Sequence, residues 1–209
     1  MKISNFKIIF IFVLFLIISC GPPKLSDATS FKIEDGTIYL SNGKQLTGKV
    51  NYPINSAESY ISINIKKKKQ SIDKTQIDKI VYNTSSGPLE YYNLKIFRNK
   101  KKNKIRKNKK IVALSIKGKV SLYFSQGSHY EQRGNMSVPV YFTEYYCKRE
   151  NEEAASLIHV DNGVVNPNAY FRYFAKRYFS DNPEIVAKIK SKEFTYRNLI
   201  EVVQFYNSK

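Results

Sequence analysis

The sequence predicts an α+β fold, in which an antiparallel β-rich body is followed by two or three short C-terminal helices. Between residues 31 and 160, short apolar runs with a period of two are separated by turn residues, as in sheets. From residue 168 onward, aromatic residues recur at the spacing of an amphipathic helix: Tyr170, Phe171, Phe174 and Tyr178. A chain of 209 residues is long enough for one such domain.

The first nineteen residues have the organisation of a signal peptide. Lys2 and Lys7 give a positive start, and residues 8–18 form an unbroken apolar run. As a helix this run would reach roughly 16 Å, about half of a ~30 Å hydrocarbon core. It is therefore too short to span a membrane comfortably and has the length of a signal-peptide core.

A cysteine stands directly after this run, in the sequence Ile17-Ile18-Ser19-Cys20. This motif resembles the lipobox of bacterial lipoproteins. The resemblance implies cleavage before Cys20 and lipid attached to that residue, which would anchor residues 20–30 as a tether. Several acyl chains anchor a protein stably. The alternatives are an ordinary signal peptide with a chance cysteine, or a short signal anchor.

Lipoproteins of this general appearance are common in Bacteroidota, where surface-exported members often carry an acidic cluster after the cysteine. This chain continues with Gly-Pro-Pro-Lys-Leu-Ser instead. The resemblance therefore implies a lipid-anchored protein of the bacterial cell envelope, facing the periplasm from the outer membrane.

The body begins with a predicted hairpin at residues 37–52. Asn42-Gly43 separates two apolar runs, and both residues tolerate a positive φ. Gly48 inside the second run suggests a β-bulge. The order of predicted strands and turns in residues 31–83 loosely resembles that of compact five-strand barrels.

The next strands are predicted from the alternation of apolar and polar residues and from the turn residues between them. Ile61, Ile63 and Ile65 share one face of a strand, and residues 66–69 form a charged turn. The remaining predicted elements are, in order, a strand or short helix near Ile77, Ile80 and Val81, a strand at 88–97, a hairpin of 111–116 and 120–124, a polar loop at 126–135, an aromatic strand at 137–147, a brief turn at 150–155 and a strand at 157–160.

Residues 161–209 form the predicted helical part. The stretch Ser180-Asp181-Asn182-Pro183-Glu184 marks the end of one helix and the start of another, with an N-cap candidate followed by proline near the first helical position. A further apolar stripe runs from Leu199 to Tyr206. The runs 173–184 and 202–207 resemble the C-terminal part of uncharacterised Bacteroidota envelope lipoproteins. That resemblance implies location and relatedness, and no chemistry.

Two sets of residues are candidates for catalysis. Cys147 with His129 or His159 would supply a nucleophile and a base. A free cysteine in an aromatic strand usually behaves as a small buried hydrophobe, so we expect Cys147 to be structural. Glu150, Glu152 and Glu153 would supply paired carboxylates, although neighbours in one polar turn are more often a solvated surface. An envelope hydrolase using either set is the alternative to a non-enzymatic protein.

The absence of paired Cys or His spacings predicts no metal and no cofactor.

The formal charge of +18 raises anionic membranes and nucleic acids as partners. Lys, Asn, Ile, Tyr and Phe are abundant together, so part of this charge reflects composition. Nine of the thirteen residues in 98–110 are basic: Arg98, Lys100, Lys101, Lys102, Lys104, Arg106, Lys107, Lys109 and Lys110. We expect an exposed, mobile loop that is available to anionic lipid or glycan. The alternative is a solvated charge run, and the envelope address argues against nucleic acid.

Tyr91-Tyr92 and Tyr145-Tyr146 are candidates for a carbohydrate or peptide surface, or for the faces of a sheet. The sequence thus predicts a lipid-anchored envelope protein with a non-enzymatic binding or scaffolding role. Its expected partners are the membrane through Cys20 and an envelope protein, anionic lipid or glycan.

Overall fold

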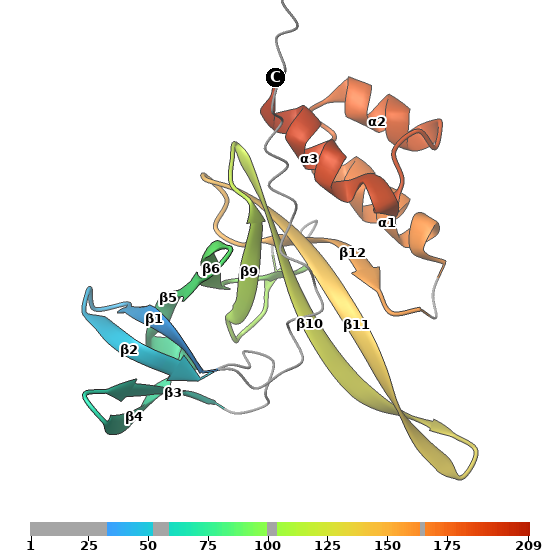
Figure 1. Ribbon diagram of the computed structural model, residues 1–209. Helices are drawn as coiled ribbons and strands as arrows, with labels where there is room; N and C mark the ends of the chain where they lie inside the picture. Colours follow the sequence, from blue (N-terminus) through green and yellow to red (C-terminus); the bar gives the residue numbers. More distant parts are fainter. Residues whose placement is uncertain (1–32, 52–58, 100–103, 164–165) are drawn as a thin grey trace, which may run out of the picture.

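The computed structural model describes residues 33–51, 59–99, 104–163 and 166–209 (Figure 1). The predicted signal peptide, Cys20, the predicted tether and the lysines at 100–102 lie outside these residues. Within them the chain is mostly antiparallel β-sheet, with three short helices at the C-terminus. No helix in this part of the chain has the length and hydropathy to cross a membrane.

A ten-stranded sheet forms the body, in the order β12-β11-β10-β9-β6-β5-β1-β2-β3-β4. Its strands are β1 Ile33–Leu40, β2 Gln45–Asn51, β3 Tyr60–Ile65, β4 Lys68–Asp73, β5 Ile77–Thr84, β6 Gly87–Leu94, β9 Lys110–Ile116, β10 Val120–Arg133, β11 Met136–Arg149 and β12 Ser156–Asp161. A separate two-stranded ribbon pairs β7 Phe97–Asn99 with β8 Lys104–Ile105, and the helices are α1 Pro167–Tyr178, α2 Pro183–Lys190 and α3 Leu199–Asn207.

The predicted β1–β2 hairpin is confirmed, with Gly43 at a φ of 82° in the turn. The bulge predicted at Gly48 is wrong, because the β1–β2 register is continuous. Gly48 instead allows β3 to approach: a Cβ there would lie 2.3 Å from the carbonyl oxygen of Asn64. The charged turn is shorter than predicted. Lys66 and Lys67 make it at positive φ, and β4 begins at Lys68.

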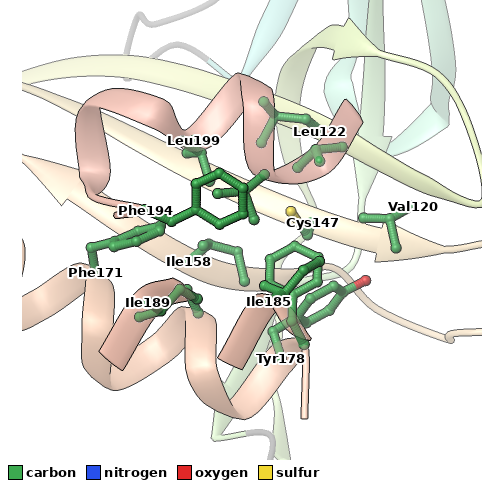
Figure 2. Close-up of a cluster of buried hydrophobic side chains, with 14 residues drawn as sticks. Val120, Leu122, Cys147, Ile158, Phe171, Tyr178, Ile185, Ile189, Phe194 and Leu199 are labelled. Carbon is green, nitrogen blue, oxygen red and sulfur yellow. The ribbon is translucent and has the colours of Figure 1, made fainter. Parts of the chain in front are cut away.

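Hydrophobic clusters lie on both faces of the sheet. One lies among β1, β2, β3, β5, β6 and β9, where the alternating Ile61 and Ile63 are buried. A second fills the space between the three helices and β10, β11 and β12, and Figure 2 shows its side chains converging from both layers. The third lies on the opposite face of the central strands, around Ile96, Val112 and Tyr146.

Two connections differ from prediction. The strand expected at 88–97 ends at Leu94, and Ile96 makes a parallel bridge to Ala155. The N–H of Phe97 donates to the carbonyl of Ala155, and the N–H of Ala155 donates to that of Lys95, both at 2.8–2.9 Å. The polar loop expected at 126–135 is wrong, since β10 continues to Arg133 and only Gly134 and Asn135 turn.

Candidate interaction surface

The long β10–β11 hairpin leaves the body of the sheet as a two-stranded arm (Figure 1). β10 pairs with β9 only as far as Phe124, and β11 pairs with β12 only from Thr143. Residues 126–142, here called the arm, therefore have no neighbouring strand at either edge among the described residues. A two-stranded ribbon alone is marginally stable in water, so an arm of this length suggests a surface that is completed by a partner.

The arm is stabilised locally by cross-strand packing. Gly127 lies opposite Phe142, whose ring covers it so closely that a Cβ at position 127 would lie 2.4 Å from the ring. The ring of His129 lies 5.8 Å from the ring of Phe142, and its Nε2 lies 3.2 Å from Glu131. Arg133 contacts the same carboxylate at 3.5 Å. This face of the arm is charged and internally paired.

The other face of the arm is uncharged. It is built from four cross-strand pairs, Gln126 with Thr143, Ser128 with Tyr141, Tyr130 with Pro139 and Gln132 with Ser137. Tyr130 and Tyr141 are 74% and 70% exposed. None of these eight positions carries a charge, in a chain with 35 basic and 17 acidic residues. Tyrosine among small hydroxyl and amide side chains is the composition of antibody paratopes, which bind proteins.

The thiol and imidazoles considered for catalysis are not assembled. Cys147 is fully buried on the face of β11 that the helices cover (Figure 2). His129 lies on the arm, and His159 is buried in β12 with both ring nitrogens lacking a hydrogen-bond partner in the described structure. A nucleophile and its base need hydrogen-bond contact. Neither histidine makes that contact with Cys147.

The three glutamates after β11 are separated by their partners. Glu152 accepts hydrogen bonds from the Arg149 guanidinium and, at 2.8 Å, from the Tyr178 hydroxyl. Glu153 pairs with Lys95 at 2.6 Å, and Glu150 is exposed. Their contacts tie the sheet to α1 and to the segment before β7, which favours a structural role over paired catalytic carboxylates.

The basic segment is partly structured, so the predicted continuous loop is wrong. Phe97 and Asn99 pair with β8, where Ile105 lies half-buried. Lys109 pairs with Asp78 at 3.5 Å, and Lys110 pairs with the largely buried Glu144. Arg98, Lys104 and Lys107 are exposed and have no acidic partner among the described residues. Arg106 lies near enough to Glu144 to lower the pKa of that carboxyl.

The tyrosine pairs fill sheet faces. Tyr91 and Tyr146 are buried, and Tyr92 packs edge-on against Tyr123 with 5.8 Å between ring centres. Tyr145 stacks on His159. Two exposed tyrosines that the sequence did not indicate, Tyr130 and Tyr141, are on the arm. The available signal was the alternation of Ser128, Tyr130 and Gln132 with His129, Glu131 and Arg133 through a segment that looked like a loop.

Burial lowers the pKa of His159, although Asp161 partly opposes the shift. The neutral imidazole lies between Tyr145 and Tyr196, with ring centres 6.0 and 5.1 Å away. The pKa of His159 is lower in the folded state than in the unfolded state. The neutral imidazole therefore contributes its full stabilisation above pH ~6.5, and this stabilisation is lost as pH falls from that value through the folded pKa. We expect stability to decrease from pH 7 to pH 5, by at most about 1.4 kcal/mol per pH unit from this group.

His159→Phe should flatten this dependence, because phenylalanine fills the same aromatic site and does not titrate. Urea unfolding of the wild-type chain and of His159→Phe at a series of pH values measures the two slopes. An unaltered slope in His159→Phe would exclude His159 as the source.

Comparison with family models, with curated proteins and with solved structures finds no match to this chain. The resemblance to Bacteroidota envelope lipoproteins therefore stays a prediction. In the described parts of the chain, no group of three or more His, Cys, Asp or Glu side chains is placed to hold a metal ion.

Proposed function

We propose that this chain is a lipid-anchored protein of the bacterial cell envelope, whose domain has a non-enzymatic binding or scaffolding role and contacts a protein partner through the arm. The observation that carries the binding role is the uncharged, tyrosine-bearing face of a ribbon that projects from the body. Tyrosine is enriched at protein interfaces, because its ring is apolar and its hydroxyl can form a hydrogen bond. The lipid anchor rests on the residue order that ends in Ser19-Cys20.

The binding role is tested by placing a photoreactive side chain at Tyr141 in intact cells. A discrete crosslinked adduct is expected there. The matched control is the same substitution at Tyr60, which is 55% exposed and lies on β3, away from the arm. A partner identified from Tyr141 and absent from Tyr60 supports an arm-specific contact. Equal or absent crosslinking at the two positions would contradict it.

Cys20→Ala is expected to abolish fatty-acid labelling of the protein, because the thiol is the group that would receive the lipid. The variant should also leave the membrane fraction or mislocalise. Labelling with a radioactive or clickable fatty acid measures the first effect, and fractionation measures the second. Cys147→Ser provides the cysteine control and should retain label. Persistence of label in Cys20→Ala would refute lipidation at this residue.

Contact of the basic segment with an anionic lipid or glycan is a weaker candidate function. Its support is the set of exposed cations without acidic partners in the described structure, Arg98, Lys104 and Lys107. Lys109 and Lys110 contribute less, because each already faces a carboxylate.

A further inference from the structure

The two free edges of the arm differ in how they are protected. Proteins block exposed strand edges with proline, lysine or a bulge. The β11 edge carries Pro139, which has no N–H to donate. The β10 edge has neither proline nor lysine between Gln126 and Gln132, and its register with β11 is continuous. The β10 edge is therefore the one that is open to strand addition.

The register identifies the backbone groups on this edge. Hydrogen-bonded and non-hydrogen-bonded pairs alternate along an antiparallel ladder. Pro139 lies opposite Tyr130, so this position suits a non-hydrogen-bonded pair, in which the backbone groups of both residues point away from each other. By alternation, the N–H and C=O groups of Ser128, Tyr130 and Gln132 face outward from β10. The turn gives the same result. In a two-residue turn the flanking pair, here Arg133 and Met136, is hydrogen-bonded, and alternation from that pair makes Tyr130 and Pro139 a non-hydrogen-bonded pair.

We propose that the β10 edge of the arm pairs with the same edge of a second copy of this chain, antiparallel about a two-fold axis at Tyr130. This proposal rests on the proposed role of the arm as a contact surface. It names a second copy as the occupant because this register of the edge with itself places no two like charges opposite each other. The pairing places Glu131 opposite His129 of the second copy, and Ser128 opposite its Gln132. It would make a continuous four-stranded ribbon of two arms.

Charge elsewhere on the chain opposes other self-contacts. The net charge of +18 makes most pairs of faces repulsive. In the two-fold register, Arg133 lies opposite Gly127 of the second copy, and no basic residue between Gly127 and Arg133 lies opposite another. A shared membrane anchor would also raise the effective concentration of one copy near another.

The pairing is tested with the full chain in intact cells by Tyr130→Cys under mild oxidation. A hydrogen-bonded pair of residues on the axis has Cα atoms about 5.5 Å apart, which a disulfide can bridge. A covalent dimer is therefore expected. The matched control is Tyr141→Cys, on the same face and equally exposed. In the four-stranded ribbon its two copies are separated by three strand spacings, roughly 14 Å, and should not crosslink.

A proline on the edge provides a second test in the Tyr130→Cys background. Ser128→Pro removes an outward donor from the β10 edge and should abolish the dimer. Ser137→Pro removes an outward donor from the β11 edge and should leave the dimer intact, with both variants checked for cooperative unfolding. The proposal is overturned if Tyr130→Cys gives no dimer, if Tyr141→Cys dimerises equally, or if Tyr130→Cys joins only a different protein. In the last case, arm-specific photocrosslinking at Tyr141 would persist, and the proposed binding function would stand without self-pairing.

Discussion

Replacing Arg149 with alanine is expected to lower the free energy of unfolding by about 3 to 5 kcal/mol, because it removes the shared partner of the largely buried Glu152 and Tyr178. The side chain of Arg149 is 19% exposed, and its guanidinium contacts Glu152 at 3.3 Å and Asp181 at 2.7 Å. It also donates to the Tyr206 hydroxyl at 3.3 Å and lies 4.4 Å from the centre of the Tyr178 ring. These contacts join the end of β11 to α1, to the turn before α2 and to α3.

Without Arg149, the negative charge of Glu152, which is 14% exposed, loses its cationic partner. The helical layer should loosen from the sheet, and Phe179 and Tyr206, which pack beside the network, should become more mobile. Urea unfolding monitored by far-UV circular dichroism measures the total loss. Near-UV spectra report on the aromatic packing. The fold should remain recognisable, since the apolar contacts of the helices are retained.

Arg177→Ala is the matched control for this prediction. Arg177 is also an arginine over a tyrosine ring, 3.9 Å from the centre of Tyr173, but both residues are exposed. An exposed contact of this kind contributes about 0.5–1 kcal/mol. A loss below about 1 kcal/mol for Arg149→Ala, or equal losses in the two variants, would show that the network is not what holds the helices to the sheet.

Local patterns in the sequence were sufficient to predict the hairpin turn at Asn42-Gly43, the alternation of β3 and the C-terminal helices. The start of α2 also follows from local chemistry, because Asn182 accepts a hydrogen bond from the N–H of Ile185 and Pro183 occupies the first helical position. These features depend on residues that lie close together in the chain. Their physical cause is therefore visible in a short stretch of sequence.

Features that depend on distant residues could not be predicted. Nothing near Arg149 in the sequence indicates its contacts, because Tyr206, which completes its site, lies 57 residues later. Ile96 gave no sign that it bridges to Ala155, which belongs to the third cluster with it. The β10 half of the arm was mistaken for a loop because neither face of the distal part of the arm is buried in the body. Without burial, a polar strand and a polar loop have similar compositions.

Replacing Lys110 with methionine is expected to cost about 2 to 3 kcal/mol at pH 7, because it leaves the carboxylate of Glu144 largely buried without its ammonium partner. Glu144 is 14% exposed, and it also accepts a hydrogen bond from the Tyr146 hydroxyl at 2.8 Å. Burial alone would raise the pKa of Glu144, but the hydrogen bond and charge of Lys110, together with the Tyr146 hydroxyl and the charge of Arg106, outweigh it and hold that pKa below its usual value. Lys110 therefore has a structural role, although the sequence grouped it with eight other cations as a candidate for anionic surfaces.

The pH dependence of the stability loss in Lys110→Met distinguishes neutralisation of Glu144 from a general effect of removing one positive charge. In the wild-type chain, the pKa of Glu144 is lower in the folded state, so its contribution is present above pH ~4.3 and is lost as pH falls through the folded pKa. In Lys110→Met, burial raises that pKa, and protonation on acidification relieves the cost. The stability difference between the two proteins should therefore narrow from pH 7 to pH 4, as measured by urea unfolding.

The matched control is Lys109→Met, which removes the adjacent and more exposed pair with Asp78. It should cost less than about 1 kcal/mol, and its stability difference from the wild-type chain should not narrow in this way. Adding Glu144→Gln to Lys110→Met should recover much of the loss, because it removes the unpaired charge. A constant difference across this pH range, or no recovery in the double variant, would mean that Lys110 stabilises the sheet by packing rather than by neutralising Glu144.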